Sequence, residues 1–487
     1  MPIFTQAVRA PEFPADLTWL NSKRKLSMKK LKGYVVLLDF WTYCCINCIH
    51  VLPDLKSIEE KFKGKPVVVI GAHSPKFENE IVLDHLQSAI ERYEITHPVI
   101  ADNNHDIWNA YAVNAWPTMI LIDPEGYVRE QVSGEGQRGH LENEIEILLK
   151  EGEVEGTLAD KPLRLELKKK KSKQTLSFPG KIEFDQKGDT LFISDSNHNR
   201  ILICDYKSPA QVKIKNIIKG NFNHPQGIYP LGNNLYVCDT DNHLLKKVDL
   251  KTKKVSTIAG TGIQAPFGQP ISGKALEIAL SSPWDIDYFD KFFYIAMAGS
   301  HQIWRYGFEN NVMELFAGNG YEGLVDNHWS DAELAQPSGL SIYGNDIYFT
   351  DSESSSLRKI NIDEEKVATL IGKGLFTFGH KDGPFNKALL QHPLGVFANS
   401  KFLYIADTYN NAIRVVNLKT KDIETLVGRE KGTDICMIGD KKCEQLALYE
   451  PNDIVAKNDL LFIADTNNHL IRVFDPRTEI LDDLKIK

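Results

Sequence analysis

The pattern of hydrophobic and polar positions divides the chain into two halves of different character. In the first half, apolar runs alternate with segments of helical periodicity. The run Tyr34–Trp41 precedes a predicted helix over Cys45–Phe62, and the run Val67–Ala72 precedes a helical stretch near Glu80–Arg92. This alternation is typical of an α/β domain. After about residue 175, short apolar runs follow one another without long helices, which predicts an all-β domain.

The second half repeats one unit of about 45–58 residues. Each unit contains four short apolar runs, and four short strands per repeat are typical of a β-propeller blade. We count six units, so the sequence predicts a six-bladed propeller. Each unit also keeps a nearly constant Pro-to-Asp spacing, with Met in place of Asp in the third: Pro179–Asp195, Pro225–Asp239, Pro283–Met297, Pro337–Asp351, Pro393–Asp407 and Pro451–Asp465.

The repeated Asp follows a strand and precedes a turn in each unit, where a short carboxylate can accept backbone N–H groups. Because near-equivalent copies recur, we interpret this Asp as structural and not catalytic. His residues at equivalent turn positions of three blades raise the alternative of a metal-binding trio. The other blades carry Asn or Ser at that position, which favours a turn function. The three His residues are His243, His301 and His469. The residues at the same position of the other blades are Asn199, Ser355 and Asn411.

Long connections between the blades should gather on one face of the propeller, and loops on a rigid scaffold are common binding sites. We therefore expect a protein partner to dock there. Cys436 and Cys443 lie in one connection and are either a regulatory disulfide or two unrelated thiols. Each connection is expected to contain a short helical piece: Lys274–Leu280, Asp331–Ala335, Asn386–Leu390 and Cys443–Tyr449.

The main chemical motif is a Cys-x-x-Cys pair, Cys45 and Cys48, placed where a strand ends and a helix is predicted to begin. Unpaired N–H groups and the helix dipole favour a thiolate at a helix N-terminus. The second thiol lies one helical turn away, within disulfide distance. Structural zinc usually requires four ligands, and no second Cys-x-x-Cys pair is present. The motif therefore predicts thiol–disulfide exchange, with a zinc site or an inert pair as alternatives.

This half resembles the thioredoxin superfamily. Asp39, Phe40 and Trp41 resemble the strand that leads to the family's thiols, and Pro53 falls where its active-site helix kinks. The stretch Val113–Thr118, followed by an apolar strand and Gly126, resembles the family's cis-proline loop and hairpin. The resemblance implies a cis Trp116–Pro117 bond. It also implies that Trp116 and Pro117 form the substrate edge and that Asp39 assists proton transfer. The longer central segment is similar to that of the TlpA branch or of peroxiredoxins.

The motif departs from that family in two respects. Cys44 stands where thioredoxins carry Trp, and it is either a third redox thiol or a small buried residue. The dipeptide between the active cysteines, Ile46-Asn47, is unusual, so a redox potential cannot be transferred from relatives. Thiol peroxidase activity is a lesser alternative, because Thr42 and Cys45 resemble part of a peroxidatic motif whose Pro is replaced by Leu38. His73, just after a strand, either tunes the thiols or is a solvated loop residue.

The repeats resemble the NHL repeat, notably in Ala406–Arg414 and Ala464–Arg472. The whole chain is similar to a family that joins a TlpA-like thioredoxin domain to a six-bladed NHL propeller, in which Cys-Cys-Ile-Asn-Cys is distinctive. We therefore predict a two-domain protein: a thioredoxin-like domain over 1–150, a linker or edge strand over 151–175, and an NHL propeller over 176–487. Either the strand Leu163–Leu167 or the tail Ile480–Ile486 is expected to complete a blade.

Composition adds limits on location and partners. The chain of 487 residues has 25% charged residues and a net charge of −8, which gives no general affinity for nucleic acid or anionic lipid. The sequence shows no apolar segment long enough for a signal peptide or a membrane span. Its seven cysteines form no paired framework, so we expect a cytoplasmic protein with reduced thiols.

The sequence therefore predicts a cytoplasmic thiol–disulfide oxidoreductase without a cofactor or metal. Cys45 would be the nucleophile and Cys48 the resolving thiol, with Asp39, Trp41, Cys44, Trp116 and Pro117 in support. The propeller would bind or position a protein substrate or redox partner. The alternative is a propeller scaffold whose redox domain is vestigial.

Overall fold

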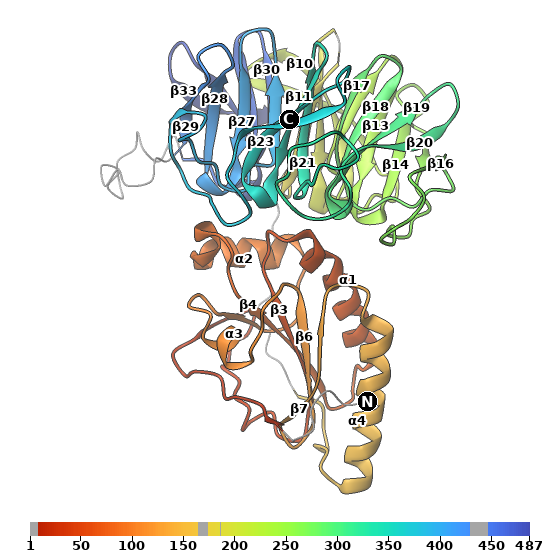
Figure 1. Cartoon of the computed structure of the whole chain (residues 1–487), viewed down its shortest axis with the longest axis vertical. Helices are drawn as coiled ribbons and strands as arrows, with labels where there is room; N and C mark the ends of the chain where they lie inside the picture. Colours follow the sequence, from red (N-terminus) through yellow and green to blue (C-terminus); the bar gives the residue numbers. More distant parts are fainter. Residues whose placement is uncertain (1–7, 164–173, 186, 429–446) are drawn as a thin grey trace. The chain divides into compact units, whose positions relative to one another are not determined.

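The computed structural model describes residues 8–163, 174–185, 187–428 and 447–487. The chain divides into two compact units, Met1–Lys171 and Ser172–Lys487, which are coloured red to yellow and yellow to blue in Figure 1. The first is an α/β unit and the second an all-β unit, as the hydrophobic pattern predicted. Among the helices that the structure describes, none is both long enough and apolar enough to cross a membrane.

The first unit is built on one sheet with the strand order β1-β7-β6-β3-β4-β5-β2. Its central strand β3 runs parallel to β4 and antiparallel to β6. The strands are β1 (Val8–Arg9), β2 (Thr18–Leu20), β3 (Val35–Trp41), β4 (Val67–His73), β5 (Val99–Ala101), β6 (Thr118–Ile122) and β7 (Tyr127–Ser133). The helices are α1 (Ile46–Lys61), the 3₁₀ turn η1 (Glu78–Ile81), α2 (Leu83–Arg92), α3 (Asp106–Ala110) and α4 (Arg138–Glu155).

Strand β3 is buried on both faces, which explains its continuous apolar sequence. Leu38 and Phe40 belong to an apolar cluster that includes Ile107 of α3. Because side chains alternate along a strand, Asp39 and Trp41 point to the opposite face. Figure 1 shows α1 and α4 on one side of this sheet and α3 on the other. The sheet therefore directs a carboxyl group into the interior behind the start of α1.

Helix α4 continues to Glu155, five residues into the range predicted as a linker or edge strand. Leu163 packs against the apolar cluster of the first unit. The remainder of the candidate closing strand Leu163–Leu167 lies outside the described residues.

The second unit consists of six sheets, each built on four consecutive antiparallel strands, so the predicted six-bladed propeller is confirmed. Three of these sheets also carry a short fifth strand. Blades one to three contain β8 (Pro179–Phe184), β9 (Thr190–Asp195), β10 (Arg200–Ser208) and β11 (Gln211–Ile218); β12 (Ile228–Leu231), β13 (Asn234–Asp239), β14 (Leu244–Asp249) and β15 (Val255–Ala259); and β17 (Pro283–Phe289), β18 (Phe292–Met297), β19 (Gln302–Gly307) and β20 (Val312–Ala317). Blades four to six contain β21 (Pro337–Tyr343), β22 (Asp346–Asp351), β23 (Ser356–Asn361) and β24 (Lys366–Ile371); β26 (Gly395–Ala398), β27 (Leu403–Asp407), β28 (Ala412–Asn417) and β29 (Asp422–Gly428); and β30 (Pro451–Lys457), β31 (Leu460–Asp465), β32 (Leu470–Asp475) and β33 (Ile480–Asp483).

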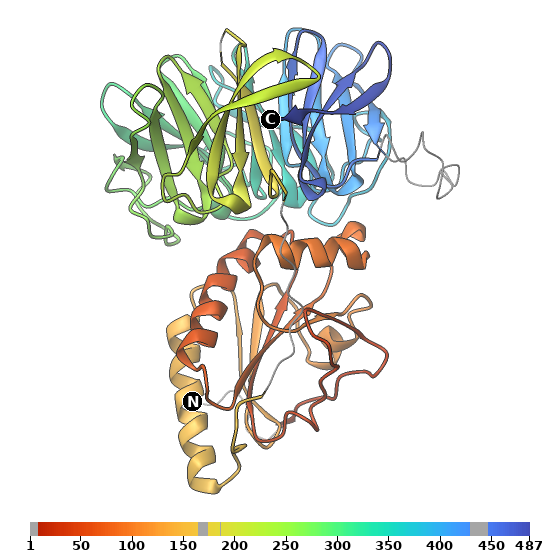
Figure 2. The ribbon, with the colours of Figure 1, turned by 180° about the vertical axis from the view of Figure 1, so that it is seen from behind.

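The C-terminal tail closes the ring. The inner strands of neighbouring blades contact one another in a closed circle, in which β30 meets β8. After β33 has completed the sixth blade, β34 (Lys485–Ile486) pairs in parallel with β11 and becomes a fifth strand of the first blade. Figure 2 shows this blue tail beside the yellow strands of the first blade. The tail, one of the two candidate segments, therefore completes a blade.

The short helical pieces predicted in the connections are wrong for the three connections whose predicted pieces the structure describes. Lys274–Leu280, Asp331–Ala335 and Asn386–Leu390 form turns, isolated bridges and the end of a short edge strand. The edge strands are β16 (Ser272–Lys274), which pairs with β20, and β25 (Gly383–Pro384), which pairs with β29. The apolar residues of these pieces recur with a period of two and not four, and they are buried between blades: Ile278 and Leu280, Ala332 and Leu334, Ala388 and Leu390.

The repeated Asp and the residue after it hold the blades together. In the fifth blade, Asp407 accepts a hydrogen bond from the backbone N–H of Gln391 at 2.8 Å, and the Thr408 hydroxyl donates to the Pro451 carbonyl of the next blade at 2.8 Å. Thr466 donates in the same way to the Pro179 carbonyl and so links the last blade to the first. The structural interpretation of the Asp is therefore supported. Equivalent hydroxyl donors are Ser196, Thr240 and Ser352.

The turn position shared by the three His residues also links the blades. Each of the six residues at this position is left-handed, and its side chain accepts the N–H of the residue before the next blade's Pro. His243 Nδ1, for example, accepts from Ser282 at 3.0 Å. Since Asn and Ser serve the same purpose elsewhere, this position has a turn function. The other acceptors are Asn199, His301, Ser355, Asn411 and His469.

Replacing Arg414 with Met is expected to destabilise the propeller by about 3 kcal/mol, because it leaves the Asp407 carboxylate buried and uncompensated. The Arg414 side chain is fully buried and donates to Asp407 at 2.6 Å and to two backbone carbonyls of the preceding connection. Denaturant unfolding monitored by far-UV circular dichroism would measure the loss. Arg477→Met is the matched control, since the Arg477–Asp475 pair lies on the surface. Equal losses in the two variants would contradict this expectation.

Candidate active site

Cys45 lies at the junction between β3 and α1. It is the N-cap residue of α1, with an extended backbone (φ −78°, ψ 119°), and its carbonyl accepts the N–H of Ile49 at 3.1 Å. Its thiol is partly exposed, whereas Cys48, one turn further on, is buried, and both are free thiols. A thiol at this position faces the positive end of the helix dipole, which favours the thiolate. The predicted positions of both cysteines therefore agree with the structure.

Cys48 is placed to remain protonated until it reacts. Burial raises its pKa well above the usual value, and the hydrogen bond and charge of Cys45 and the charge of Asp39 raise it further. The backbone N–H of Thr42 donates to the Cys48 thiol and opposes this effect. A buried thiol with a raised pKa suits the resolving position of the pair.

Asp39 lies behind the thiols as an unpartnered carboxyl group. It is 1% exposed, and neither of its oxygens has a hydrogen-bond partner. Burial raises its pKa to about 7, while the charge of His97 opposes the rise. The indole of Trp41, two residues further along β3, is also fully buried, and its N–H has no partner. A buried carboxyl that titrates near neutral pH can accept or release a proton under ordinary conditions.

The Trp116–Pro117 peptide bond is cis, as predicted. The register of β6 pairs Thr118 with Phe40, which places Pro117 beside the end of β3, where the loop to Cys45 begins. The Trp116 indole N–H donates to the Ser74 carbonyl at 3.0 Å, and its ring lies 4.6 Å from that of Trp108. Trp116 is therefore held in a defined orientation next to the active-site loop.

The structure also contains a polar cluster that sequence reasoning did not identify. Glu80 is fully buried, and its carboxylate accepts hydrogen bonds from the Thr42 hydroxyl at 2.6 Å and the Cys44 N–H at 3.1 Å. Cys44 is itself buried, with its Sγ 3.4 Å from the Thr42 Oγ1. Glu80 had been placed only within a helical stretch. Nothing in its local sequence distinguishes it from the surface carboxylates that helices commonly carry.

His73 belongs to the same cluster, so the interpretation of a solvated loop residue is wrong. It is fully buried between the rings of Trp41 and Tyr43, at centroid distances of 5.1 and 5.4 Å. Its Nε2 lies 3.9 Å from Glu80 Oε1. His73 is buried because β4 continues to this residue and pairs it with Trp41 of β3.

Two further cysteines that the structure describes belong to the second unit. Cys204 and Cys238 are fully buried in propeller strands. Cys436 and Cys443 lie outside the described residues.

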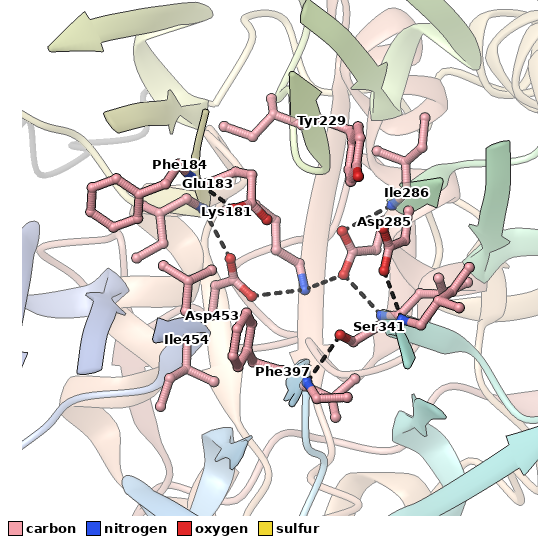
Figure 3. Close-up of a pocket in the computed structure, with 18 of the residues that line it drawn as sticks. Lys181, Glu183, Phe184, Tyr229, Asp285, Ile286, Ser341, Phe397, Asp453 and Ile454 are labelled. Carbon is pink, nitrogen blue, oxygen red and sulfur yellow. Dashed lines mark hydrogen bonds and ion pairs between the residues drawn. The ribbon is translucent and has the colours of Figure 1, made fainter. Parts of the chain in front are cut away.

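The propeller axis contains a polar cavity of about 200 Å³ lined by the inner strands (Figure 3). At its centre, the Lys181 ammonium donates to Asp285 at 2.9 Å and to the Leu394 carbonyl at 2.8 Å, and lies 3.5 Å from Asp453. Burial alone would lower the pKa of Lys181, but the two Asp residues raise it overall. Lys181 therefore bridges across the axis between several blades.

The carboxylates around this cavity bind backbone N–H groups of neighbouring blades. Asp453 accepts from Ile182 at 2.9 Å, Asp285 from Leu340 at 2.9 Å, and Asp287 from Ile342 at 2.7 Å. The fourth carboxylate of the lining, Glu183, accepts from the N–H of Phe184 in its own strand at 2.7 Å. Since the three Asp residues each bind a neighbouring blade, we assign them to the joining of blades. Among the described residues, no group of three or more acidic, His or Cys side chains is arranged to hold a metal ion.

Comparisons with known proteins agree with this architecture. Residues 33–128 match the family model described as thioredoxin-like, and residues 448–474 match the model described as NHL repeat. The fold and the paired cysteines therefore define a protein in which a thioredoxin-like domain is joined to an NHL-type propeller. Human NHL repeat-containing protein 2 is 38% identical over 526 residues, which cover 99% of this chain and 72% of that protein. The chain thus belongs to the NHL repeat-containing protein 2 family.

Two further relatives differ in extent. The Arabidopsis thaliana protein SUPPRESSOR OF QUENCHING 1, chloroplastic, is 40% identical over 501 residues; this match covers 96% of the present chain but only 47% of that protein. The chain therefore spans about half the length of this plant relative. The thiol-disulfide oxidoreductase ResA of Bacillus cereus is 33% identical over 137 residues, which cover 28% of this chain and 75% of ResA. The similarity to ResA supports a redox role for the first unit.

Proposed function

We propose that this protein is a thiol–disulfide oxidoreductase that acts on protein disulfides. The observation that carries the proposal is the pair of free thiols at the start of α1, with Cys45 partly exposed and Cys48 buried one turn away. This geometry presents one sulfur to a substrate and keeps the other ready to close an internal disulfide.

In the proposed reaction, the Cys45 thiolate attacks one sulfur of the substrate disulfide and forms a mixed disulfide, and the other substrate sulfur leaves as a thiolate. Cys48 then transfers its proton to the Asp39 carboxylate and attacks the sulfur of Cys45. The second substrate thiolate leaves, and the Cys45–Cys48 disulfide remains. Two electrons have passed to the substrate, so a dithiol donor must reduce the protein again. Trp116 and Pro117 would form the edge along which the substrate lies.

We further propose that the propeller positions the protein substrate through its connections. Ile263 and Phe267, between the second and third blades, are 72% and 75% exposed, and Tyr321 in the next connection is 60% exposed. The rings of Phe267 and Tyr321 lie 5.4 Å apart, so these two exposed side chains form one apolar surface. Exposed apolar clusters of this kind are typical of protein-binding sites. A cytoplasmic location, where both active thiols would rest reduced, completes the proposal.

A glutathione redox titration of the Cys45–Cys48 pair tests the oxidoreductase. A potential near or below about −250 mV would suit a reductant in the cytosol. The Cys48→Ser variant should then accumulate a mixed disulfide with its substrate in cells. Failure of the two thiols to form a disulfide at all would instead favour the propeller scaffold with a vestigial redox domain.

The double variant Phe267→Ser/Tyr321→Ser tests the docking surface in the same cells. In a Cys48→Ser background, it should reduce the yield of trapped protein while leaving the redox potential of the wild-type thiol pair unchanged. An unchanged yield of trapped protein would contradict a docking role for these residues.

A further inference from the structure

A buried polar site adjoins Asp39 at Gly71. The register pairs Asp39 of β3 with Gly71 of the parallel strand β4, and side chains at paired positions stand on the same face of a sheet. A Cβ atom on Gly71 would lie 2.9 Å from Trp41 Nε1 and 3.4 Å from His97 Nε2. These two nitrogens therefore meet on the Asp39 side of the sheet, in space that any larger residue at position 71 would fill.

The polar atoms at this site lack partners of their own. Neither oxygen of Asp39 has a hydrogen-bond partner, and the same holds for Trp41 Nε1 and His97 Nε2, although all three side chains are buried. Buried polar groups are ordinarily hydrogen-bonded, and a buried water molecule usually has about three partners. An indole N–H donor, an imidazole nitrogen and a carboxyl group therefore suit one bridging water molecule.

His97 links this buried site to the surface. Its Nδ1 lies 3.4 Å from Oε2 of Glu59 in α1, and the Thr96 hydroxyl donates to the same oxygen at 3.0 Å. The Glu59 side chain is 24% exposed, whereas that of His97 is 3% exposed. The backbone of His97 is also fixed, since its carbonyl accepts the Asn21 amide at 2.8 Å. One nitrogen of the ring thus faces the interior and the other faces a carboxylate that reaches water.

Such a ring is suited to moving a proton. An imidazole can accept a proton at one nitrogen and release another from the second nitrogen. The buried Asp39 carboxyl group, which receives the proton of Cys48 in the reaction proposed above, is almost shielded from solvent. That proton must leave after each oxidation of the thiol pair, and a proton must return when the pair is reduced again.

Resting on the oxidoreductase function proposed above, we propose that His97 is a positioning residue that acts through Asp39 and relays its proton to Glu59 and solvent. The proton of Asp39 passes through the bridging water to His97 Nε2, and the Nδ1 proton passes to the Glu59 carboxylate and then to bulk water. When a dithiol donor reduces the pair, the same groups carry a proton inward to the Cys48 thiolate, which restores the original tautomer of His97. No electrons pass along this path.

The released proton can be timed against the chemical steps with 5,5′-dithiobis(2-nitrobenzoic acid) as the substrate. Attack by Cys45 releases one thionitrobenzoate, and resolution by Cys48 releases the second together with the Cys48 proton. Stopped-flow absorbance in weakly buffered solution records thionitrobenzoate and, through the dye cresol red, the proton. The measurement is made at about pH 8.5, where a carboxyl group with a pKa of about 7 ionises.

The reduced full chain is used with Cys436→Ser and Cys443→Ser, so that these two thiols do not add to the signal. In this parent protein, the proton should appear together with the second thionitrobenzoate. If only the first thionitrobenzoate is released from the Cys45–Cys48 pair, the oxidoreductase proposal itself fails, independently of His97.

Two variants interrupt the proposed path at different points. His97→Gln removes the ring that exchanges protons, and Glu59→Gln keeps the ring but removes the carboxylate beside solvent. In both variants, we expect the proton to appear about tenfold or more slowly than the second thionitrobenzoate, while both thionitrobenzoate releases stay within about twofold of the parent rates. His140→Gln is the matched control, because His140 and Glu130 form a His–carboxylate pair at 3.6 Å in the same unit with His140 exposed. It should behave like the parent.

A proton that appears together with the second thionitrobenzoate in either His97→Gln or Glu59→Gln would overturn the proposed path. An equal slowing of the proton and of both thionitrobenzoate releases would also overturn it, since a merely structural role would affect all three signals alike. The same delay in His140→Gln would show that the signal does not depend on the buried site. Far-UV circular dichroism checks the fold, and the half-buried Glu59 position decides the outcome if His97→Gln does not fold.

Discussion

Replacing Cys45 with Ser is expected to lower the turnover of a small disulfide substrate by at least about a thousandfold. A serine hydroxyl at this position is not ionised at neutral pH, so the partly exposed nucleophile at the start of α1 is lost. The buried Cys48 has a raised pKa and cannot substitute for it. Turnover is measured under steady-state conditions with dithiothreitol as the electron donor.

Cys204→Ala is the control for this experiment. Cys204 is a fully buried thiol in β10 of the propeller unit, and its replacement should leave turnover within about twofold. A comparable loss in this variant would show that the assay responds to folding and not to nucleophilic attack. Residual turnover of Cys45→Ser above a few per cent would contradict the assignment of Cys45 as the nucleophile.

Cys44→Ala, assayed alongside, distinguishes the two interpretations of the third thiol. The side chain of Cys44 is 1% exposed, and its backbone N–H donates to Glu80. These observations favour the small buried residue, because a substrate cannot reach the sulfur without local opening of the structure. Unchanged turnover would support that interpretation, whereas a large loss with an intact fold would support a third redox thiol.

Asp39→Asn is expected to raise the free energy of unfolding of the first unit by about 4 kcal/mol at pH 8. The folded-state pKa of Asp39 is raised to about 7 by burial, against an ordinary value of 3.8. Between these values the folded protein binds more protons than the unfolded chain, so stability falls as pH rises. Each unit of increase in pH lowers the free energy of unfolding by about 1.4 kcal/mol, and this decrease is complete above about pH 7. Below about pH 4, Asp39 is protonated in both states and contributes no slope.

Hydrogen exchange of the β3 amides, corrected for intrinsic rates at each pH, reports the local unfolding free energy. The local unfolding free energy of the wild-type protein should decrease between about pH 4 and 7. In Asp39→Asn it should stay nearly constant over the same pH range. Glu155→Gln, at the exposed end of α4, is the matched control and should keep the wild-type slope. A profile of Asp39→Asn that parallels the wild type would show that Asp39 is not buried in a charge-excluding environment.

Local patterns were sufficient to predict the main elements. The apolar run of β3, the cysteine at the start of α1 and the six units of four strands could be read from a short window or from a repeat. The cis proline was predicted from the resemblance to the thioredoxin superfamily. The same local reasoning failed for the blade connections. The pattern there predicts helices, but Ala388 and Leu390 are both buried on one side of an extended segment, with the half-buried Leu389 between them.

Contacts between distant segments were beyond the reach of the sequence. Glu80 meets Thr42 across 38 residues of chain, and His73 is buried because a strand pairing brings it to Trp41. A carboxylate in a polar segment has the same local sequence whether it faces water or a buried hydroxyl. Only the packing of the segment after β4 against the active-site loop determines which of these occurs.

The sequence by itself determined the position of the paired cysteines and the architecture, because the cysteines lie at a strand–helix junction and the blades follow a repeat. The tertiary structure alone decided the environment of each group. In the folded chain, the Asp39 carboxyl group is buried without a hydrogen-bond partner, and the Glu80 carboxylate accepts four hydrogen bonds. The Thr466 hydroxyl donates to the Pro179 carbonyl, 287 residues away, and so links the last blade to the first. Burial and hydrogen bonding, which set the pKa values of these groups, arise only when segments that are far apart in the chain come together.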